Sequence, residues 1–207
     1  RYLNKKIKLY LDWNESDLVW PNLQKIHSNF IFEENLNKYP EIGNDELIKF
    51  LHNYEISEAC VDFFPGSDIA HEYILRTFSN PGEEILILNP GYSNFSVTAE
   101  SLGLVVKKIS LEEDDFIYEN NFFKKIYNYS EVPKLIYLIN PHSPTGHILS
   151  LSQIKSLLKK FENTFFILDE AYIDFCFDKT ASNLIENFSN LIITRSFSKA
   201  FSLAGAR

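Results

Sequence analysis

The sequence has little of what marks several specialised classes of protein. Among its 207 residues there are only two cysteines, Cys60 and Cys176, too few and too far apart for a secreted disulfide scaffold. No apolar run approaches the ~18 residues that a membrane-spanning helix needs. The 28 acidic residues outnumber the 20 basic ones, and the formal charge of -8 argues against a nucleic-acid-binding surface. These absences predict a cytoplasmic protein that has neither a nucleic acid nor a membrane as a partner.

Methionine is absent, even at position 1, and the sequence stops at Arg207, directly after a stretch with a helical pattern. We therefore expect the sequence to be part of a longer chain that is truncated at its carboxyl end. With 45% hydrophobic and 23% charged residues, its composition is that of an ordinary globular protein. Its length suffices for one large domain, or for a domain with a small appendage.

What the chain does have is a repeating pattern in which a short apolar run is followed by a turn and a helix-like stretch. The predicted strands are residues 61–64, 84–88, 105–110, 134–140, 164–170 and 190–195. Strands that alternate with helices indicate a mostly parallel sheet, and runs as apolar as LIYLI and FFIL are typical of strands buried on both faces. We therefore predict a three-layer α/β/α domain over residues 41–207, preceded by residues 1–40 as an N-terminal arm and part of a small domain.

Chemically useful residues follow four of the predicted strands. Ligand sites in parallel sheets lie at the carboxyl ends of the strands. One such cluster could arise by chance, but four of them at the same edge of a sheet are harder to explain in that way. The residues at these strand ends are Gly66, Ser67, Asp68, Asn140, Asp169, Ser196, Ser198 and Lys199.

Lys199 stands out because it follows a buried strand and is flanked by Ser196 and Ser198. Serine hydroxyls and the free N–H groups at the start of a helix bind phosphate well, and Arg207 could add a guanidinium. A lysine becomes a nucleophile toward carbonyls when desolvation or a nearby cation lowers its pKa. A phosphorylated aldehyde satisfies both halves of this stretch, so we hypothesise that it binds pyridoxal 5'-phosphate (PLP). A surface lysine at the start of a helix is the alternative.

This hypothesis requires further groups around the cofactor. Asp169 would lie beside the pyridine nitrogen and keep it protonated, although it could instead be a structural carboxylate that caps a helix. Asn140 and Tyr172 would contact the 3-hydroxyl, and the ring of Tyr92 would stack on the cofactor. Residues 66–68 open a predicted helix and would give the phosphate a second contact.

Three motifs, in this order and spacing, resemble the fold-type I PLP-dependent aminotransferases, and most of all their histidinol-phosphate aminotransferase group. They are NPHSPTG (140–146), LDEAYIDF (168–175) and SFSKAFSLAGAR (196–207). Weaker matches, GSD, PGYSNF and LNKYPE, lie at residues 66–68, 90–95 and 36–41. The resemblance covers nearly the whole chain and implies the large, PLP-binding domain of that family, without the family's C-terminal part.

The resemblance implies roles that agree with those expected from the residues themselves. Lys199 would hold PLP as a Schiff base and carry a proton between the substrate carbon and the cofactor carbon. Tyr39 would reach the cofactor phosphate of the neighbouring subunit, which implies a homodimer with shared active sites. The positions that match the family's phosphate contacts are Ser67, Asp68, Ser196, Ser198 and Arg207.

Transamination is the activity that the resemblance implies, with glutamate as the expected donor and histidinol phosphate or a related phosphorylated ketone as the other substrate. A decarboxylase of a phosphorylated amino acid remains an alternative, because the cofactor residues support either reaction. An inactive fragment or a non-catalytic PLP-fold regulator is a second alternative, although no DNA-binding region is visible. Residues 11–16, LDWNES, depart from the family's LDANENP and leave the substrate open. No metal is expected, and His142, at a variable position of its motif, is expected to face solvent.

Overall fold

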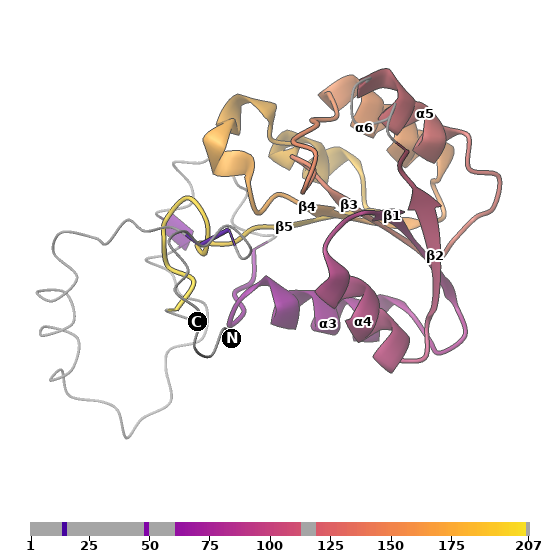
Figure 1. The fold of residues 1–207 in the computed structure, drawn as a ribbon, viewed down its shortest axis with the longest axis horizontal. Helices are drawn as coiled ribbons and strands as arrows, with labels where there is room; N and C mark the ends of the chain where they lie inside the picture. Colours follow the sequence, from indigo (N-terminus) through magenta and orange to yellow (C-terminus); the bar gives the residue numbers. More distant parts are fainter. Residues whose placement is uncertain (1–13, 16–47, 50–60, 113–118, 206–207) are drawn as a thin grey trace, which may run out of the picture.

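A computed structural model of the chain describes residues 14–15, 48–49, 61–112 and 119–205. These residues form three layers, in which a central sheet lies between two layers of helices (Figure 1). The predicted α/β/α architecture is thus confirmed. Tyr39, Arg207 and nearly all of the predicted N-terminal arm lie outside the described residues, as does the predicted boundary at residue 40.

The central sheet has five strands, and every neighbouring pair is parallel. They are β1 (Glu84–Asn89), β2 (Val105–Ser110), β3 (Leu135–Ile139), β4 (Phe165–Asp169) and β5 (Leu191–Thr194). Their spatial order is β2-β1-β3-β4-β5. The order therefore reverses between β1 and β3, and open parallel sheets bind ligands beside such a reversal, at the carboxyl ends of the strands.

The helices divide between the two faces of the sheet, as Figure 1 shows. Helices α3 (Ser67–Phe78) and α4 (Ser93–Ser101) cover one face. Helices α5 (Glu119–Tyr127) and α6 (Leu151–Lys160) cover the other. Three short 3-10 helices share this second face: η3 (Ile173–Phe175), η4 (Phe177–Lys179) and η5 (Ser182–Asn187). None of the helices in the described residues is both long and apolar enough to cross a membrane.

Alternate side chains of the strands fill two separate cores, as the pleat of a strand requires. Leu86 and Leu88 of β1 pack into the core beneath α5 and α6. Ile85 and Ile87 pack into the opposite core, together with Leu75 of α3. The strands are therefore buried on both faces, which explains the continuously apolar runs in the sequence.

The helix ends follow their sequence signals. Ser150 caps α6, because its hydroxyl accepts a hydrogen bond from the N–H of Gln153 while the side chain of Gln153 accepts one from the N–H of Ser150. Gly103 follows α4 with a φ of 80°, a conformation that glycine adopts at little cost. These signals fix where the loop after β3 enters α6 and where α4 turns into β2.

Two predicted elements are not formed. Residues 61–64 pair with no described strand; Phe63 and Phe64 instead line a cavity of about 440 Å³ together with Ile192 and Thr194 of β5. Residues 198–205, expected to begin a helix, form turns instead. Ser202 has a φ of 54°, which a right-handed helix cannot accommodate.

Candidate active site

The carboxyl ends of β3, β4 and β5 lie in register, so the residues that follow them meet at one edge of the sheet. Asp169 pairs with Ile139 on one side and with Thr194 on the other. The N–H of Asn140 donates to the carbonyl of Asp169 at 2.8 Å. The structure therefore brings the motif after β3, the motif after β4 and the Ser196–Lys199 stretch to the same place.

Two segments that are far apart in the sequence face each other across the 440 Å³ cavity at this edge. Gly66 and Ser67 lie at the start of α3, and Ser196 and Ser198 lie on the loop after β5. Gly66 has a φ of 91°, which a residue with a side chain rarely adopts, and no side chain caps the helix. The free N–H groups of α3, the positive end of its dipole and the serine hydroxyls make this a suitable site for a phosphate.

Tyr92 is held in a fixed orientation at the start of α4. Its hydroxyl donates to Oδ1 of Asp68 at 2.8 Å and accepts from Nδ2 of Asn94 at 3.1 Å. Burial, and then the hydrogen bond to the Asp68 carboxylate, raise the pKa of Tyr92 to about 12, so the side chain remains a neutral phenol. Asp68, in the first turn of α3, thus holds the hydroxyl of the tyrosine that is expected to stack on the cofactor.

Lys199 lies beside Tyr172, and Asn14 links the two. The Lys199 Nζ is 5.7 Å from the centre of the Tyr172 ring, within the range of a cation–π contact. The side-chain amide of Asn14 donates to the Tyr172 hydroxyl at 2.9 Å. The backbone carbonyl of Asn14 accepts a long hydrogen bond of 3.5 Å from Nζ of Lys199. Asn14, which belongs to the LDWNES segment, thus contacts the predicted nucleophile.

Asp169 is buried at the end of β4 and is surrounded by neutral donors. The hydroxyl of Tyr137 donates to Oδ2 at 2.5 Å, and the N–H of Ala171 donates to Oδ1 at 3.0 Å. Nε2 of His71 lies 3.7 Å from Oδ2. Among the side chains that the structure describes, no lysine or arginine lies within ion-pair distance of this carboxylate. Within the described part of the chain, this carboxylate is therefore held by hydrogen bonds from neutral groups.

Asn140 presents a donor with no partner. The side chain is 1% exposed, and its Oδ1 accepts the N–H of Leu149 at 2.8 Å. Nδ2 is also buried, but it contacts no acceptor in the described part of the chain. Since a buried donor without an acceptor is costly, this amide is suited to a ligand oxygen.

The expectation that His142 faces solvent is wrong. The side chain is 2% exposed, its Nδ1 is 2.8 Å from Oγ1 of Thr145, and its ring packs edge-on against Phe122. Burial, and then the nearby His147, lower the pKa of His142 to about 4. The loop folds back here because the N–H of His142 donates to the carbonyl of His147, which turns the histidine inward.

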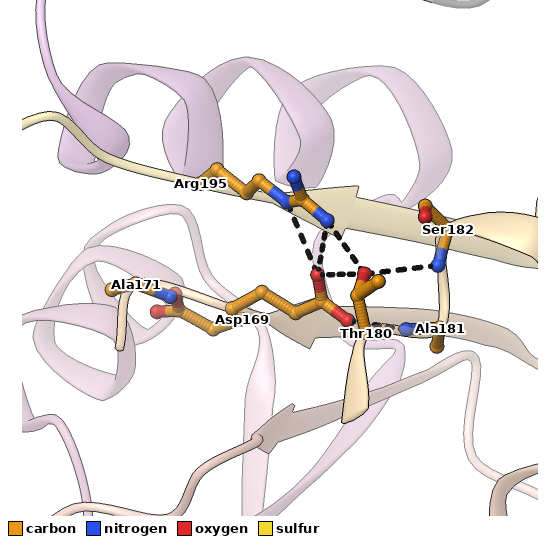
Figure 2. Close-up of polar contacts among 7 residues, drawn as sticks. Asp169, Ala171, Thr180, Ala181, Ser182 and Arg195 are labelled. Carbon is orange, nitrogen blue, oxygen red and sulfur yellow. Dashed lines mark hydrogen bonds and ion pairs between the residues drawn. The ribbon is translucent and has the colours of Figure 1, made fainter. Parts of the chain in front are cut away.

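A second buried carboxylate, Glu170, directly follows Asp169. Its Oε2 accepts from Arg195 through Nε at 3.1 Å and Nη2 at 2.9 Å, and from the Thr180 hydroxyl at 2.8 Å. Its Oε1 accepts the N–H of Ala181 at 2.7 Å. Figure 2 shows Arg195, Thr180 and Ala181 close together, and all three donate to the Glu170 carboxylate. The network joins the end of β4 to the end of β5, and so ties the segment after Asp169 to the strand that leads to Lys199.

Comparison with known proteins gives this arrangement a family. Residues 19–207 match the model of the class I and II aminotransferases. The chain belongs to this family. The resemblance expected from its three motifs is thus confirmed, and so is the fold that the resemblance implied.

Relatives of this aminotransferase chain include enzymes of phosphorylated compounds. A dihydroxyacetone phosphate transaminase from Campylobacter jejuni is 38% identical, over 96% of this chain and 54% of the relative. A histidinol-phosphate aminotransferase from Buchnera aphidicola subsp. Melaphis rhois is 33% identical, over 100% of this chain and 56% of the relative. The crystal structure of histidinol-phosphate aminotransferase from Sinorhizobium meliloti in complex with pyridoxal-5'-phosphate has a TM-score of 0.78 and 25% identity, over 94% of this chain and 53% of that one. The chain thus spans about half the length of the relatives it matches.

Several residues of the aminotransferase site were not expected from the sequence. Tyr137 is the only polar side chain in LIYLI, and this was the one available signal that β3 contributes a donor. His71 and Thr194 gave no signal, because only the packing of α3 over β5 brings them to Asp169. Glu170 was in view within LDEAYIDF, but nothing in the sequence indicated Arg195 as its partner.

Proposed function

We propose that the whole protein is a PLP-dependent aminotransferase that moves an amino group between glutamate and a small phosphorylated ketone. One observation carries the proposal. A lysine amine, a buried carboxylate that has only neutral partners, an unpaired amide donor and an anion site all lie at the same edge of the sheet. The packing of a hydrophobic core does not require any of these polar groups. The chain's membership of the aminotransferase family supports the assignment.

The described residues fit PLP by their chemistry. Asp169 would pair with the protonated ring nitrogen, since no lysine or arginine of the described residues lies within ion-pair distance of its carboxylate. The unpaired Nδ2 of Asn140, together with the Tyr172 hydroxyl, would hold the 3-hydroxyl. Tyr92 would stack on the ring, and the serines that line the 440 Å³ cavity would hold the phosphate. Bound PLP would supply an electron sink for the substrate carbon that loses its proton.

Lys199 would supply the amine that links the cofactor to the protein and the base that moves the substrate proton. Its contacts with the Tyr172 ring and the Asn14 carbonyl hold the amine at the sheet edge. We propose that Arg207, predicted at the phosphate, adds a cation to the same edge of the sheet. Both curated relatives above are named for phosphorylated substrates, which supports a phosphorylated ketone here.

We also propose that the protein is a cytoplasmic homodimer with shared active sites, in which Tyr39 of the partner subunit reaches the cofactor phosphate. Residues 1–40 would form the arm that contacts the partner. Large apolar side chains on the outer surface of α3 and α4 support a contact there, because Tyr73 is 59% exposed and Val97 is 61% exposed.

The test of the cofactor assignment uses the full-length protein and PLP. We expect the wild type to develop the absorbance band of a lysine-bound PLP, and Lys199→Ala to lack it. Lys155→Ala, which alters an exposed lysine of α6, serves as the control and keeps the band. A band of the same shape and strength in Lys199→Ala would contradict the assignment.

The test of the reaction type measures keto-acid formation and carbon dioxide release in parallel, with phosphorylated and unphosphorylated ketones as acceptors. We expect keto acid from glutamate and no carbon dioxide. Asp169→Asn should still bind the cofactor, although more weakly, and lose at least about a hundredfold in turnover, because an amide cannot balance a protonated ring nitrogen. Carbon dioxide as the main product, or full turnover in Asp169→Asn, would refute the proposal.

A further inference from the structure

A buried histidine lies directly behind Asp169, on the side away from solvent. His71 belongs to α3, is 1% exposed, and has edge-on ring contacts with Phe95 and Tyr137. Its Nε2 is 3.1 Å from Oγ1 of Thr194 and 3.7 Å from Oδ2 of Asp169. One imidazole nitrogen thus faces two oxygen atoms, one of which belongs to the carboxylate that is assigned to the ring nitrogen of PLP.

The surroundings of the two ring nitrogens select one tautomer. Nδ1 of His71 is buried and has no hydrogen-bond partner among the residues that the structure describes. A proton on Nδ1 would leave a buried donor without an acceptor, and would also turn the lone pair of Nε2 toward the Asp169 carboxylate. A proton on Nε2 instead donates to Thr194 and directs the positive end of the N–H dipole at Asp169. The neutral ring that carries its proton on Nε2 is therefore favoured.

Burial also keeps this ring uncharged. Desolvation lowers the pKa of His71 below its ordinary value of 6.5, although the Asp169 carboxylate, and then that of Asp68, act in the opposite direction. The titratable groups that act on the ring come from three elements: Asp68 is on α3 itself, Asp169 is on β4, and Tyr137 on β3 is a neutral phenol whose pKa burial raises. Thr194 of β5 and Phe95 of α4 carry no charge.

A purely structural role would not call for an imidazole here. Leu75, one turn further along the same face of α3, is completely buried and apolar. An aliphatic side chain at position 71 would fill the core without leaving a nitrogen unsatisfied. The imidazole gives this position something that an aliphatic residue lacks, a neutral N–H that bonds to Thr194 and lies 3.7 Å from Oδ2 of Asp169.

We propose that His71, braced by Thr194, is a positioning residue that orients the Asp169 carboxylate toward the ring nitrogen of PLP without neutralising its charge. The inference rests on the proposed function, in which Asp169 pairs with that nitrogen. A cation in place of His71 would compete for the same carboxylate, and an apolar residue would leave one of its oxygens less well held. His71 lies behind Asp169 and acts on the cofactor only through it.

The first measurement is nitrogen-15 NMR of the histidine rings in the full-length protein without cofactor. We expect the His71 ring to carry its proton on Nε2 and to have a bare Nδ1 at neutral pH. The Asp169→Asn variant should shift the Nε2 signal, because the carboxylate that the N–H faces has become an amide. A wild-type ring protonated on Nδ1, or on both nitrogens, would overturn the proposal.

The second measurement is PLP affinity in two variants of the full-length protein. His71→Leu removes the donor, and we expect it to weaken PLP binding roughly tenfold. His71→Gln keeps a neutral N–H near the place of Nε2 and should remain within about threefold of the wild type. Urea unfolding of each variant establishes that the protein compared is folded.

A filler role would give a different pattern. Equal PLP affinity in His71→Leu and the wild type, or equal losses in His71→Leu and His71→Gln, would overturn the positioning role. A wild-type protein that does not bind PLP at all is a separate outcome, since it would overturn the proposed function and this inference together.

Discussion

Asp169 and Glu170 are consecutive, buried carboxylates, yet the protein stabilises them in opposite ways. Successive residues at the end of a strand point to opposite faces of the sheet. Asp169 turns toward α3 and receives a phenol, a backbone N–H and a neutral imidazole. Glu170 turns toward the 3-10 helices and receives a guanidinium, a hydroxyl and a backbone N–H. In Figure 2 the Asp169 side chain lies apart from the cluster around Arg195.

The difference separates a structural carboxylate from one that is available to a ligand. The charge of Glu170 is already balanced by Arg195 at 2.9 Å, so this pair fixes the geometry of the two strand ends and offers no charge to a ligand. The described donors to Asp169 are neutral groups, which hydrogen-bond to its carboxylate without pairing it with a cation. Two neighbouring residues of one motif thus have separate tasks, and the partners of each carboxylate indicate which task it has.

The largest expected effect on stability comes from breaking the Glu170 side. Arg195→Gln would leave Glu170 buried without a cation, and we expect it to lower the free energy of unfolding by about 3–5 kcal/mol. Arg76→Gln is the matched control. Arg76 pairs with Glu72 at 2.8 Å, nearly the same distance, but on the exposed surface of α3, where such a pair contributes at most about 1 kcal/mol.

Urea unfolding of both variants and the wild type measures this contrast. Similar losses in Arg195→Gln and Arg76→Gln would show that burial does not distinguish the two pairs. The distinction drawn between Glu170 and Asp169 would then lose its basis, since it depends on the buried pair being the strong one.

A smaller effect is expected on the Asp169 side. Tyr137→Phe removes the hydroxyl that donates to Oδ2 and keeps the ring, which stacks on Phe95 at 3.8 Å. We expect it to lower the free energy of unfolding by about 2 kcal/mol, as for other hydrogen bonds to a charged group. Because the variant weakens the support of Asp169, PLP affinity should fall as well, whereas Arg195→Gln acts first on stability.

Tyr129→Phe is the control for this substitution. The Tyr129 hydroxyl also contacts a carboxylate, that of Glu131 at 3.2 Å, but on the surface, so its removal should change stability by less than about 0.5 kcal/mol. If Tyr137→Phe were as mild as Tyr129→Phe and bound PLP normally, the neutral donors around Asp169 would not matter.

The sequence predicted one side of this comparison better than the other. Asp169 could be found because it ends a continuously apolar strand, where a buried carboxylate is costly unless it has partners. Tyr137 lies 32 residues earlier in the chain, and His71 reaches Thr194 across 123 residues, so register and helix packing alone bring them together. Residues 61–64 show the same limit in the fold, because an apolar run becomes a strand only where a neighbouring strand can pair with it. Tyr39 and Arg207 stay predictions.

The smallest effect concerns acid pH, which would make the two sides of the comparison more alike by charging His71. Burial holds the pKa of folded His71 below the value of 6.5 expected in the unfolded chain, so below that pH the unfolded chain binds the additional proton. The stability that the neutral ring supports is therefore present above pH 6.5 and is lost as the pH falls. A single proton can change the free energy of unfolding by at most about 1.4 kcal/mol per pH unit.

We expect the wild type to lose more stability than His71→Leu between about pH 6.5 and pH 5.5, as measured by urea unfolding. His142 also titrates low and contributes equally to both proteins, so the difference between them isolates His71. Parallel losses in the two proteins would mean that His71 takes up its proton as readily in the folded as in the unfolded state, and that Asp169 has a cation behind it after all.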